Sequence, residues 1–155
     1  MGVAQRRDQV EPMSVLELSQ INLHGSARTV ETAIDEAGQI LVATGAVTAE
    51  YPNYMHDREN LVSTYMGNFL AIPHGTNEGK DTVLDSALSF VRYDDAIDWN
   101  GNPVRFVVGI AGKDGGHMDV LSSIALIFSD EEQVDRLLVA ETPEDVFALL
   151  GDVNA

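Results

Sequence analysis

The chain has 155 residues, enough for one domain with a buried core, and the absence of cysteine excludes disulfides, thiolate nucleophiles and cysteine metal sites. Nine basic and 25 acidic residues give a formal net charge of −16, which argues against nucleic acid and against docking on anionic lipid. We find neither an apolar signal-peptide core nor an apolar run near the roughly 18 residues of a membrane span, so we expect a cytoplasmic protein without membrane insertion.

The first half of the chain predicts one strand and then a helix. Residues 1–13 are polar and without periodicity, so we expect a flexible tail before a single domain over residues 14–155. The segment INLH (21–24) is a candidate first strand. Apolar residues at helical spacing predict a helix over residues 29–45, with Thr29 as its N-cap.

The middle of the chain predicts a second helix and three strands. We expect the helix over residues 48–60, with Thr48 as its N-cap. The apolar run FLAI (69–72) predicts a short buried strand. Residues 86–93 alternate as a strand does, and residues 104–112 form a nearly continuous apolar run that is typical of a central strand.

The pair Asn100-Gly101 lies between the last two strands and predicts a tight hairpin turn. Three helices are expected after it: residues 115–128, a helix opened by a capping box of Ser129 and Glu132, and a helix between Thr142-Pro143 and Gly151. Interleaved helices and strands predict an α/β fold with helices on both faces of a sheet. The hairpin makes that sheet mixed.

The stretch FLAIPHGT ends a predicted strand on a histidine. Pro73 stiffens the approach to His74, and Gly75 leaves the ring uncrowded. In α/β folds, ligands bind at the carboxyl ends of the strands, where His74 is expected to lie. The amides of Gly75 and Thr76 and the Thr76 hydroxyl are candidate donors to an anion on the imidazole. A neutral imidazole can carry a phosphoryl group covalently, although an ordinary turn histidine explains this pattern equally well.

Two more side chains can join a phosphoryl site. His117 follows the glycine-rich stretch GKDGG and opens a predicted helix, where free backbone amides favour phosphate. If the strand before it runs beside FLAI, His117 faces His74. Arg58 lies on the helix ahead of FLAI and can reach a phosphoryl group with its guanidinium. A surface histidine and an arginine paired with a neighbouring acid remain open as alternatives.

The remaining motifs are negative. The sequence contains no P-loop, no dinucleotide fingerprint, no nucleophile elbow and no H-x-x-x-H pair, so no local motif supports a nucleotide-binding or zinc site. His24 and His56 have no reactive groups around them in the sequence, and we interpret both as surface or packing residues.

The segments YMHDRENLVSTYMGNFLAIPHGT (54–76) and GIAGKDGGHMDVLSSIALIFSDEEQVDRLL (109–138) resemble enzyme IIA domains of the phosphotransferase system, mannitol/fructose class. The resemblance covers about residues 15–150. Its specific part is the AIPHG turn followed by an A-x-K-x-x-x-H segment at a helix start. The D-R-E helix and the H-G-T sequence favour the mannitol type.

The resemblance implies a mixed five-stranded sheet and a phosphotransferase activity. His74 would accept a phosphoryl group on Nε2 from the phosphohistidine of HPr. It would pass the group to a cysteine on the IIB domain of a permease for mannitol or a related polyol or fructose. His117 would stabilise the transferred group, and Arg58 would supply positive charge. No metal or organic cofactor is implied, because the phosphate arrives as an activated phosphoramidate.

Some features depart from the family or stay open. Asn68 stands where mannitol-type members carry a glutamate, and we expect the IIB acceptor on a separate polypeptide. Phe69 and Met66 are candidates for an apolar rim that docks HPr, although a core position is the better interpretation of Phe69. A regulatory IIA-like protein would use the same phosphohistidine as a switch. A metal- or ligand-binding module built on His74 and His117 is a third possibility.

Overall fold

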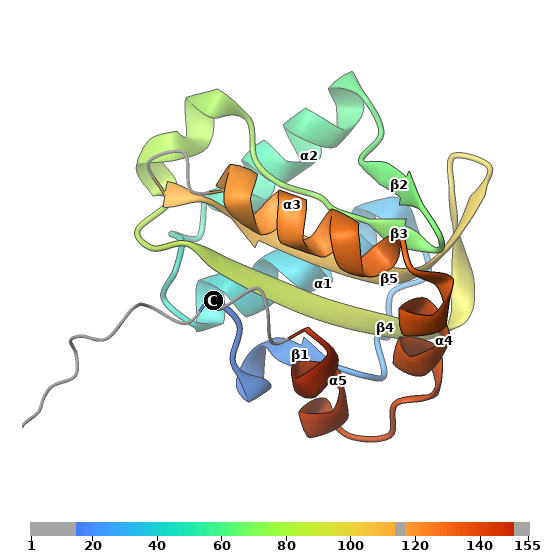
Figure 1. The fold of residues 1–155 in the computed structure, drawn as a ribbon. Helices are drawn as coiled ribbons and strands as arrows, with labels where there is room; N and C mark the ends of the chain where they lie inside the picture. The colour runs from blue at the N-terminus through green and yellow to red at the C-terminus, as the bar shows by residue number, and fades with distance from the viewer. Residues whose placement is uncertain (1–14, 114–116, 151–155) are drawn as a thin grey trace, which may run out of the picture.

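The computed structural model describes residues 15–113 and 117–150, with only the backbone of residues 117–119. One sheet of five strands forms the centre of the domain, in the order β1-β4-β5-β3-β2 (Figure 1). The strands are β1 (Ile21–Asn22), β2 (Tyr65–Gly67), β3 (Leu70–Ala71), β4 (Ala87–Trp99) and β5 (Asn102–Ala111). The pairs β1–β4 and β3–β5 are parallel and the other two are antiparallel, which confirms the predicted mixed sheet.

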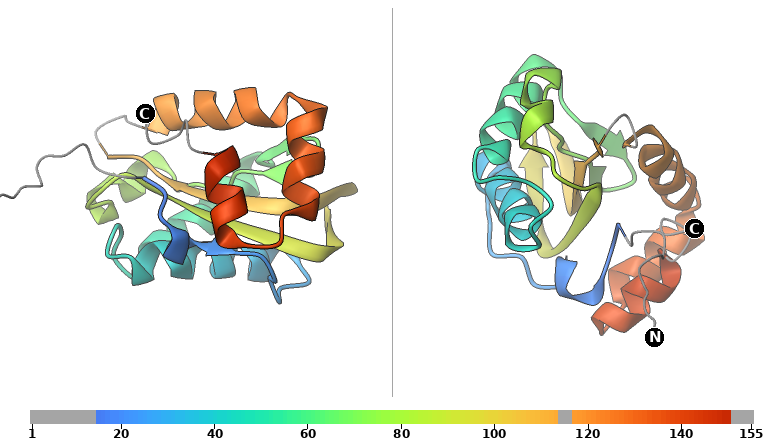
Figure 2. Two further views of the ribbon diagram at one scale, coloured as in Figure 1. Left: turned by 60° about the horizontal axis from the view of Figure 1, so that its bottom comes forward. Right: turned by 90° about the vertical axis from the view of Figure 1, so that its left-hand side faces the viewer.

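Helices cover both faces of this sheet, as predicted (Figure 2). On one face lie α1 (Val30–Ala43) and α2 (Tyr51–Leu61), and on the other lie α3 (His117–Phe128), α4 (Glu131–Val139) and α5 (Pro143–Leu149). Two short 3₁₀ helices, η2 (Leu18–Gln20) and η3 (Asn77–Thr82), complete the elements. In the part of the chain that is described, no helix is long and apolar enough to cross a bilayer.

The central strand β5 builds two cores because its side chains alternate between the faces. Phe106, Val108 and Ile110 pack under α3, α4 and α5. Val107 and Ala111 pack under α1 and α2. The β4–β5 hairpin turns at Asn100-Gly101 with φ of 56° and 96°, which confirms the predicted tight turn. The nearly continuous apolar sequence of β5 follows from its burial on both sides.

The predicted N-cap Thr29 is confirmed, and so is the predicted start of the last helix at Thr142-Pro143. The Thr29 side chain accepts from the Thr32 amide at the start of α1, and the Thr142 side chain accepts from the Asp145 amide at the start of α5. Both side-chain oxygens satisfy an amide that has no partner within the helix. Gly151 and the predicted N-terminal tail lie outside the described residues.

Two predicted caps are wrong. The second helix starts at Tyr51 after Glu50 rather than after Thr48, whose hydroxyl donates to the Glu50 carboxylate at 2.6 Å. The cap of α4 is Asp130, which accepts from the Glu132 amide, while the Ser129 hydroxyl donates back to the end of α3. At the start of α4 the Asp130 carboxylate therefore replaces the expected hydroxyl as the cap, whereas Glu50 occupies the N-cap position of α2 without a side-chain hydrogen bond to the helix.

The hairpin of β2 and β3 has no counterpart among the predictions. Gly67, Asn68 and Phe69 all have positive φ, at 93°, 50° and 69°, and they turn the chain tightly between the strands. Phe69 therefore belongs to the turn and not to the strand FLAI. Its side chain is 36% exposed and that of Met66 is 50% exposed, so the interpretation of Phe69 as a core residue is wrong.

Candidate active site

The turn that carries His74 continues the pairing of β3 with β5. The Ile110 amide donates to the Pro73 carbonyl at 3.0 Å, and His74 bridges Ile110 in parallel register. Because β3 and β5 run parallel, the segments that follow them emerge at the same edge of the sheet. The helix α3 starts at His117 after β5, so the backbone confirms that both predicted histidines follow adjacent parallel strands.

The ring of His74 has a defined tautomer. Its Nδ1 lies 2.9 Å from the carbonyl oxygen of Ile72. A carbonyl oxygen only accepts hydrogen bonds, so Nδ1 carries the proton and Nε2 of the neutral ring keeps its lone pair. In this tautomer Nε2 is the ring nitrogen with the lone pair, which the residue pattern alone did not distinguish.

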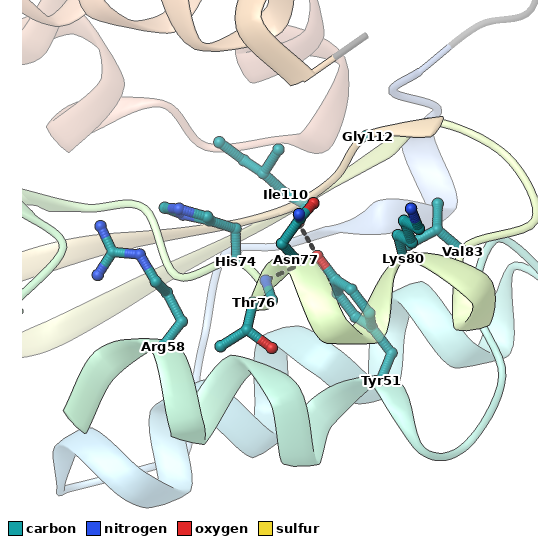
Figure 3. A pocket seen from close by; sticks show the side chains of 10 residues that line it. Tyr51, Arg58, His74, Thr76, Asn77, Lys80, Val83, Ile110 and Gly112 are labelled. Carbon is teal, nitrogen blue, oxygen red and sulfur yellow. Dashed lines mark hydrogen bonds between the residues drawn. The ribbon is translucent and has the colours of Figure 1, made fainter. Parts of the chain in front are cut away.

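Tyr51 lies directly beneath this turn (Figure 3). Its hydroxyl donates to the Ile110 carbonyl at 2.6 Å and accepts from the Gly75 amide at 2.8 Å. Burial raises the pKa of Tyr51 to about 12, so the hydroxyl stays protonated. A Cβ on Gly75 would lie 2.6 Å from the Tyr51 ring, which explains the glycine after the histidine. No sequence signal had identified Tyr51.

The prediction that the amides of Gly75 and Thr76 stay free for an anion is wrong. The Gly75 amide donates to Tyr51, and the Thr76 amide donates to the Tyr54 carbonyl at 3.3 Å. The turn packs on α2, and residues of α2 accept the hydrogen bonds of both amides. The Thr76 residue itself still lines the pocket beside His74.

His74 and Arg58 line one pocket of about 230 Å³. Arg58 comes from the last turn of α2 and donates to the Val62 carbonyl at 2.8 Å. In Figure 3 the imidazole and the guanidinium extend to the same side of the pocket. Lys80 of η3, which the sequence did not single out, is a second cation in the lining. None of the described lining residues is acidic, although the chain carries 25 acids, so the pocket suits an anion.

The family model of the phosphoenolpyruvate-dependent sugar phosphotransferase system, EIIA 2, matches residues 14–153. The chain belongs to this EIIA 2 family. The mannitol-specific phosphotransferase enzyme IIA component of Halalkalibacterium halodurans is 48% identical over 141 residues, which is 91% of this chain and 97% of that protein. Its counterpart from Bacillus subtilis is 44% identical over 143 residues, covering 92% and 100%.

A solved structure shares the fold of this EIIA 2 protein. It is the complex of enzyme IIAMtl and phosphorylated enzyme IIBMtl from Escherichia coli, with a TM-score of 0.83 and 36% identity. The match covers 88% of this chain and 97% of that one. The resemblance that the two sequence segments indicated is therefore confirmed, together with the phosphotransferase class.

His74 is the one histidine in the described lining of the pocket of this EIIA 2 protein. The His117 side chain lies outside the described residues. His56 contacts Asp35 at 2.7 Å between α2 and α1, and His24 lies 3.7 Å from Asp94 on the surface, so both are packing or surface residues as expected. Within the described ranges no cluster of three or more histidines and acids could hold a metal.

Asn68, which stands where the family pattern has a glutamate, makes a hydrogen bond within the fold. Its side-chain amide donates to the Phe128 carbonyl at 2.7 Å, which ties the β2–β3 hairpin to the end of α3. A carboxylate cannot donate this hydrogen bond. Asn68 is also absent from the described lining of the His74 pocket.

Proposed function

We propose that His74 of this EIIA 2 protein carries a phosphoryl group on Nε2 from HPr to the IIB cysteine of a permease for mannitol or a related polyol or fructose. One observation carries this proposal. The hydrogen bond from Nδ1 to the Ile72 carbonyl leaves Nε2 as the nucleophile, beside a pocket lined by Arg58 and Lys80. We place the reaction in the cytoplasm.

Two displacements at phosphorus make up the reaction. In the first, the Nε2 lone pair attacks the phosphoryl group of phospho-HPr, a new N–P bond forms, and the donor nitrogen keeps the electron pair of the bond that breaks. The His74 ring becomes cationic, and the Ile72 carbonyl stabilises it through Nδ1–H. In the second, the cysteine thiolate attacks phosphorus, an S–P bond forms, and the electron pair of the N–P bond returns to Nε2.

The lining residues supply charge and hydrogen bonds for the phosphoryl oxygens. Arg58 and Lys80 compensate the negative charge, and the Thr76 hydroxyl donates from the same pocket. Gly75 contributes through the geometry of the turn. His117, at the start of α3, is proposed to stabilise the group in transit. The proposal needs no metal and no organic cofactor.

The partners follow from the same chemistry. The Escherichia coli relative was solved with phosphorylated enzyme IIBMtl, which supports a IIB domain as the acceptor here. The exposed side chains of Phe69 and Met66 are proposed to belong to the surface that docks HPr and IIB. A regulatory IIA-like role shares the first displacement and differs in the second, and the mannitol-specific names of the compared relatives favour transport.

Intact mass spectrometry tests the proposal. The protein is incubated with phosphoenolpyruvate, enzyme I and HPr, followed by a mannitol IIB domain. We expect one acid-labile phosphoryl group on the wild type and on His56→Ala, none on His74→Ala, and slowed transfer in His117→Ala. Passage to IIB supports transport over a regulatory role. An unmodified wild type in the presence of charged HPr, or a phosphorylated His74→Ala, overturns the proposal.

A further inference from the structure

One face of α2 contacts three successive parts of the site. Tyr51, Tyr54 and Arg58 are three and four residues apart and so lie on the same side of the helix. The Tyr51 hydroxyl accepts from the Gly75 amide, the Tyr54 carbonyl accepts from the Thr76 amide, and Arg58 lines the pocket. The helix thus fixes the spacing between the histidine turn and the cation.

Both neighbours of His74 are attached to the same residue of β5. The carbonyl of Pro73 accepts from the Ile110 amide directly. The amide of Gly75 reaches the Ile110 carbonyl through the Tyr51 hydroxyl, with distances of 2.8 Å and 2.6 Å (Figure 3). The segment Pro73-His74-Gly75, called the arch below, is therefore held to Ile110 at two points. The second point is the side chain of Tyr51, which comes from α2. Tyr51 is 3% exposed, so water does not replace it.

We propose that Tyr51 is a positioning residue for phosphoryl transfer, whose hydroxyl holds the arch so that Nδ1 of His74 stays on the Ile72 carbonyl and Nε2 stays aimed into the pocket. The expected effect on the transfer rate rests on the proposed role of His74, whereas the expected effect on the orientation of its ring does not. Tyr51 acts through Gly75 and does not touch the phosphoryl group.

Loss of the hydroxyl has a definite consequence. In Tyr51→Phe the Gly75 amide loses its acceptor and the Ile110 carbonyl loses its donor, so one support of the arch is released. The His74 ring then samples orientations in which Nδ1 leaves the Ile72 carbonyl. We expect the transfer rate from phospho-HPr to fall about ten- to hundredfold, as misplacement of a reacting group does. The KM for phospho-HPr should stay within about twofold, because the docking surface is unchanged.

Tyr93→Phe is the matched control. Tyr93 is also buried, and its hydroxyl donates to Glu36 at 2.7 Å, on α1 rather than at the histidine turn. Rapid-quench kinetics with phospho-HPr give kcat and KM, and thermal unfolding verifies the fold. Nitrogen-15 NMR of the His74 ring reports the tautomer without any activity. We expect Tyr51→Phe to lose rate and the Nδ1–H tautomer, and Tyr93→Phe to keep both.

A second variant tests the same contact independently, in case Tyr51→Phe does not fold. In Gly75→Ala the new Cβ displaces the Tyr51 ring, so it should reproduce the loss of rate and of the tautomer. Wild-type rate and tautomer in a folded Tyr51→Phe overturn the inference, and so do equal losses in Tyr93→Phe. If the wild type accepts no phosphoryl group, the proposed function fails, while the ring NMR still decides whether Tyr51 orients His74.

Discussion

The two ends of α2 are attached to the domain in different ways. At the N-terminal end the neutral hydroxyl of Tyr51 bonds to two backbone groups beside His74. At the C-terminal end the buried carboxylate of Glu59 accepts from the amide and hydroxyl of Thr64, at 2.8 Å and 2.6 Å, and from the indole of Trp99 at 2.9 Å. Tyr51 therefore contacts the histidine turn, whereas Glu59 satisfies buried polar groups between α2 and β4.

The difference separates activity from stability along a single helix. Buried donors that lose a charged acceptor destabilise the whole fold, because no water replaces the acceptor. A neutral hydroxyl between backbone groups orients a turn and contributes less to the fold. We therefore expect variants of Glu59 to unfold more readily, and variants of the site residues Tyr51 and Arg58 to transfer the phosphoryl group more slowly.

Glu59→Gln should have the largest effect on stability. The variant places an amide NH₂ against the donors of Thr64 and Trp99, and we expect a loss of about 2–3 kcal/mol in the free energy of unfolding. Urea denaturation measures it, with the exposed Glu50→Gln at the other end of the helix as control. The phosphotransfer rate per folded molecule should stay within about threefold. Unchanged stability, or a rate lost without stability, contradicts the separation.

Arg58→Gln should show the opposite behaviour. Removing the cation from the pocket should slow phosphoryl transfer about ten- to hundredfold, or about 1.4–2.7 kcal/mol in the barrier. Urea denaturation should move by less than about 1 kcal/mol, because the side chain makes one hydrogen bond to a carbonyl. Single-turnover kinetics with phospho-HPr make the measurement, and Arg28→Gln, remote from the pocket, is the control. Equal transfer rates in the two variants would show that Arg58 does not contribute to phosphoryl transfer.

The contact between Glu36 and the Tyr93 hydroxyl predicts a pH-dependent contribution to stability. Burial by itself raises the pKa of Glu36, but hydrogen bonds from the Ser26 and Ala27 amides and from the Tyr93 and Ser26 hydroxyls outweigh it, and the pKa is lowered. Its stabilisation is therefore complete above the ordinary glutamate pKa and is lost as the pH falls through the lowered value. We expect Glu36→Gln to lose about 1 kcal/mol at pH 7, allowing for partial exposure, and less in acid.

Urea denaturation of Glu36→Gln at pH 7 and at pH 3 measures this dependence. The variant should approach the wild type in stability as the pH falls through the lowered pKa of Glu36, because the wild-type carboxylate becomes protonated there. Phosphoryl transfer at pH 7 should be unaffected, because the contact lies away from the histidine turn. A constant difference across this range would contradict the assigned pKa direction.

The smallest effect is expected at the middle of α2. His56 and Asp35 are 2.7 Å apart, but their side chains are 28% and 56% exposed. Solvent screens such a pair, so Asp35→Asn should change the free energy of unfolding by less than about 0.5 kcal/mol. A larger loss would show that the packing of α2 on α1 depends on this contact, and the contrast between Glu59 and the site residues of α2 would then need revision.

The sequence by itself determined the features that depend on neighbouring residues. Asn100-Gly101 adopts the positive φ of a tight turn, the Thr29 and Thr142 hydroxyls reach amides three residues ahead, and the apolar run of β5 predicts a central strand. The Pro-His-Gly turn also made His74 a candidate for the site, because a stiff and a permissive residue flank it.

Only the tertiary structure decided what lies around that histidine. The Tyr51 hydroxyl meets a carbonyl 59 residues away and an amide 24 residues away, and neither separation leaves a periodic signal in the sequence. The same packing provides acceptors for the Gly75 and Thr76 amides, which the sequence had made candidate donors to an anion, and it places Lys80 in the pocket lining. Local patterns predict where a reactive group sits in an element, whereas its tautomer and hydrogen-bond partners depend on which distant atoms the fold brings within hydrogen-bond distance.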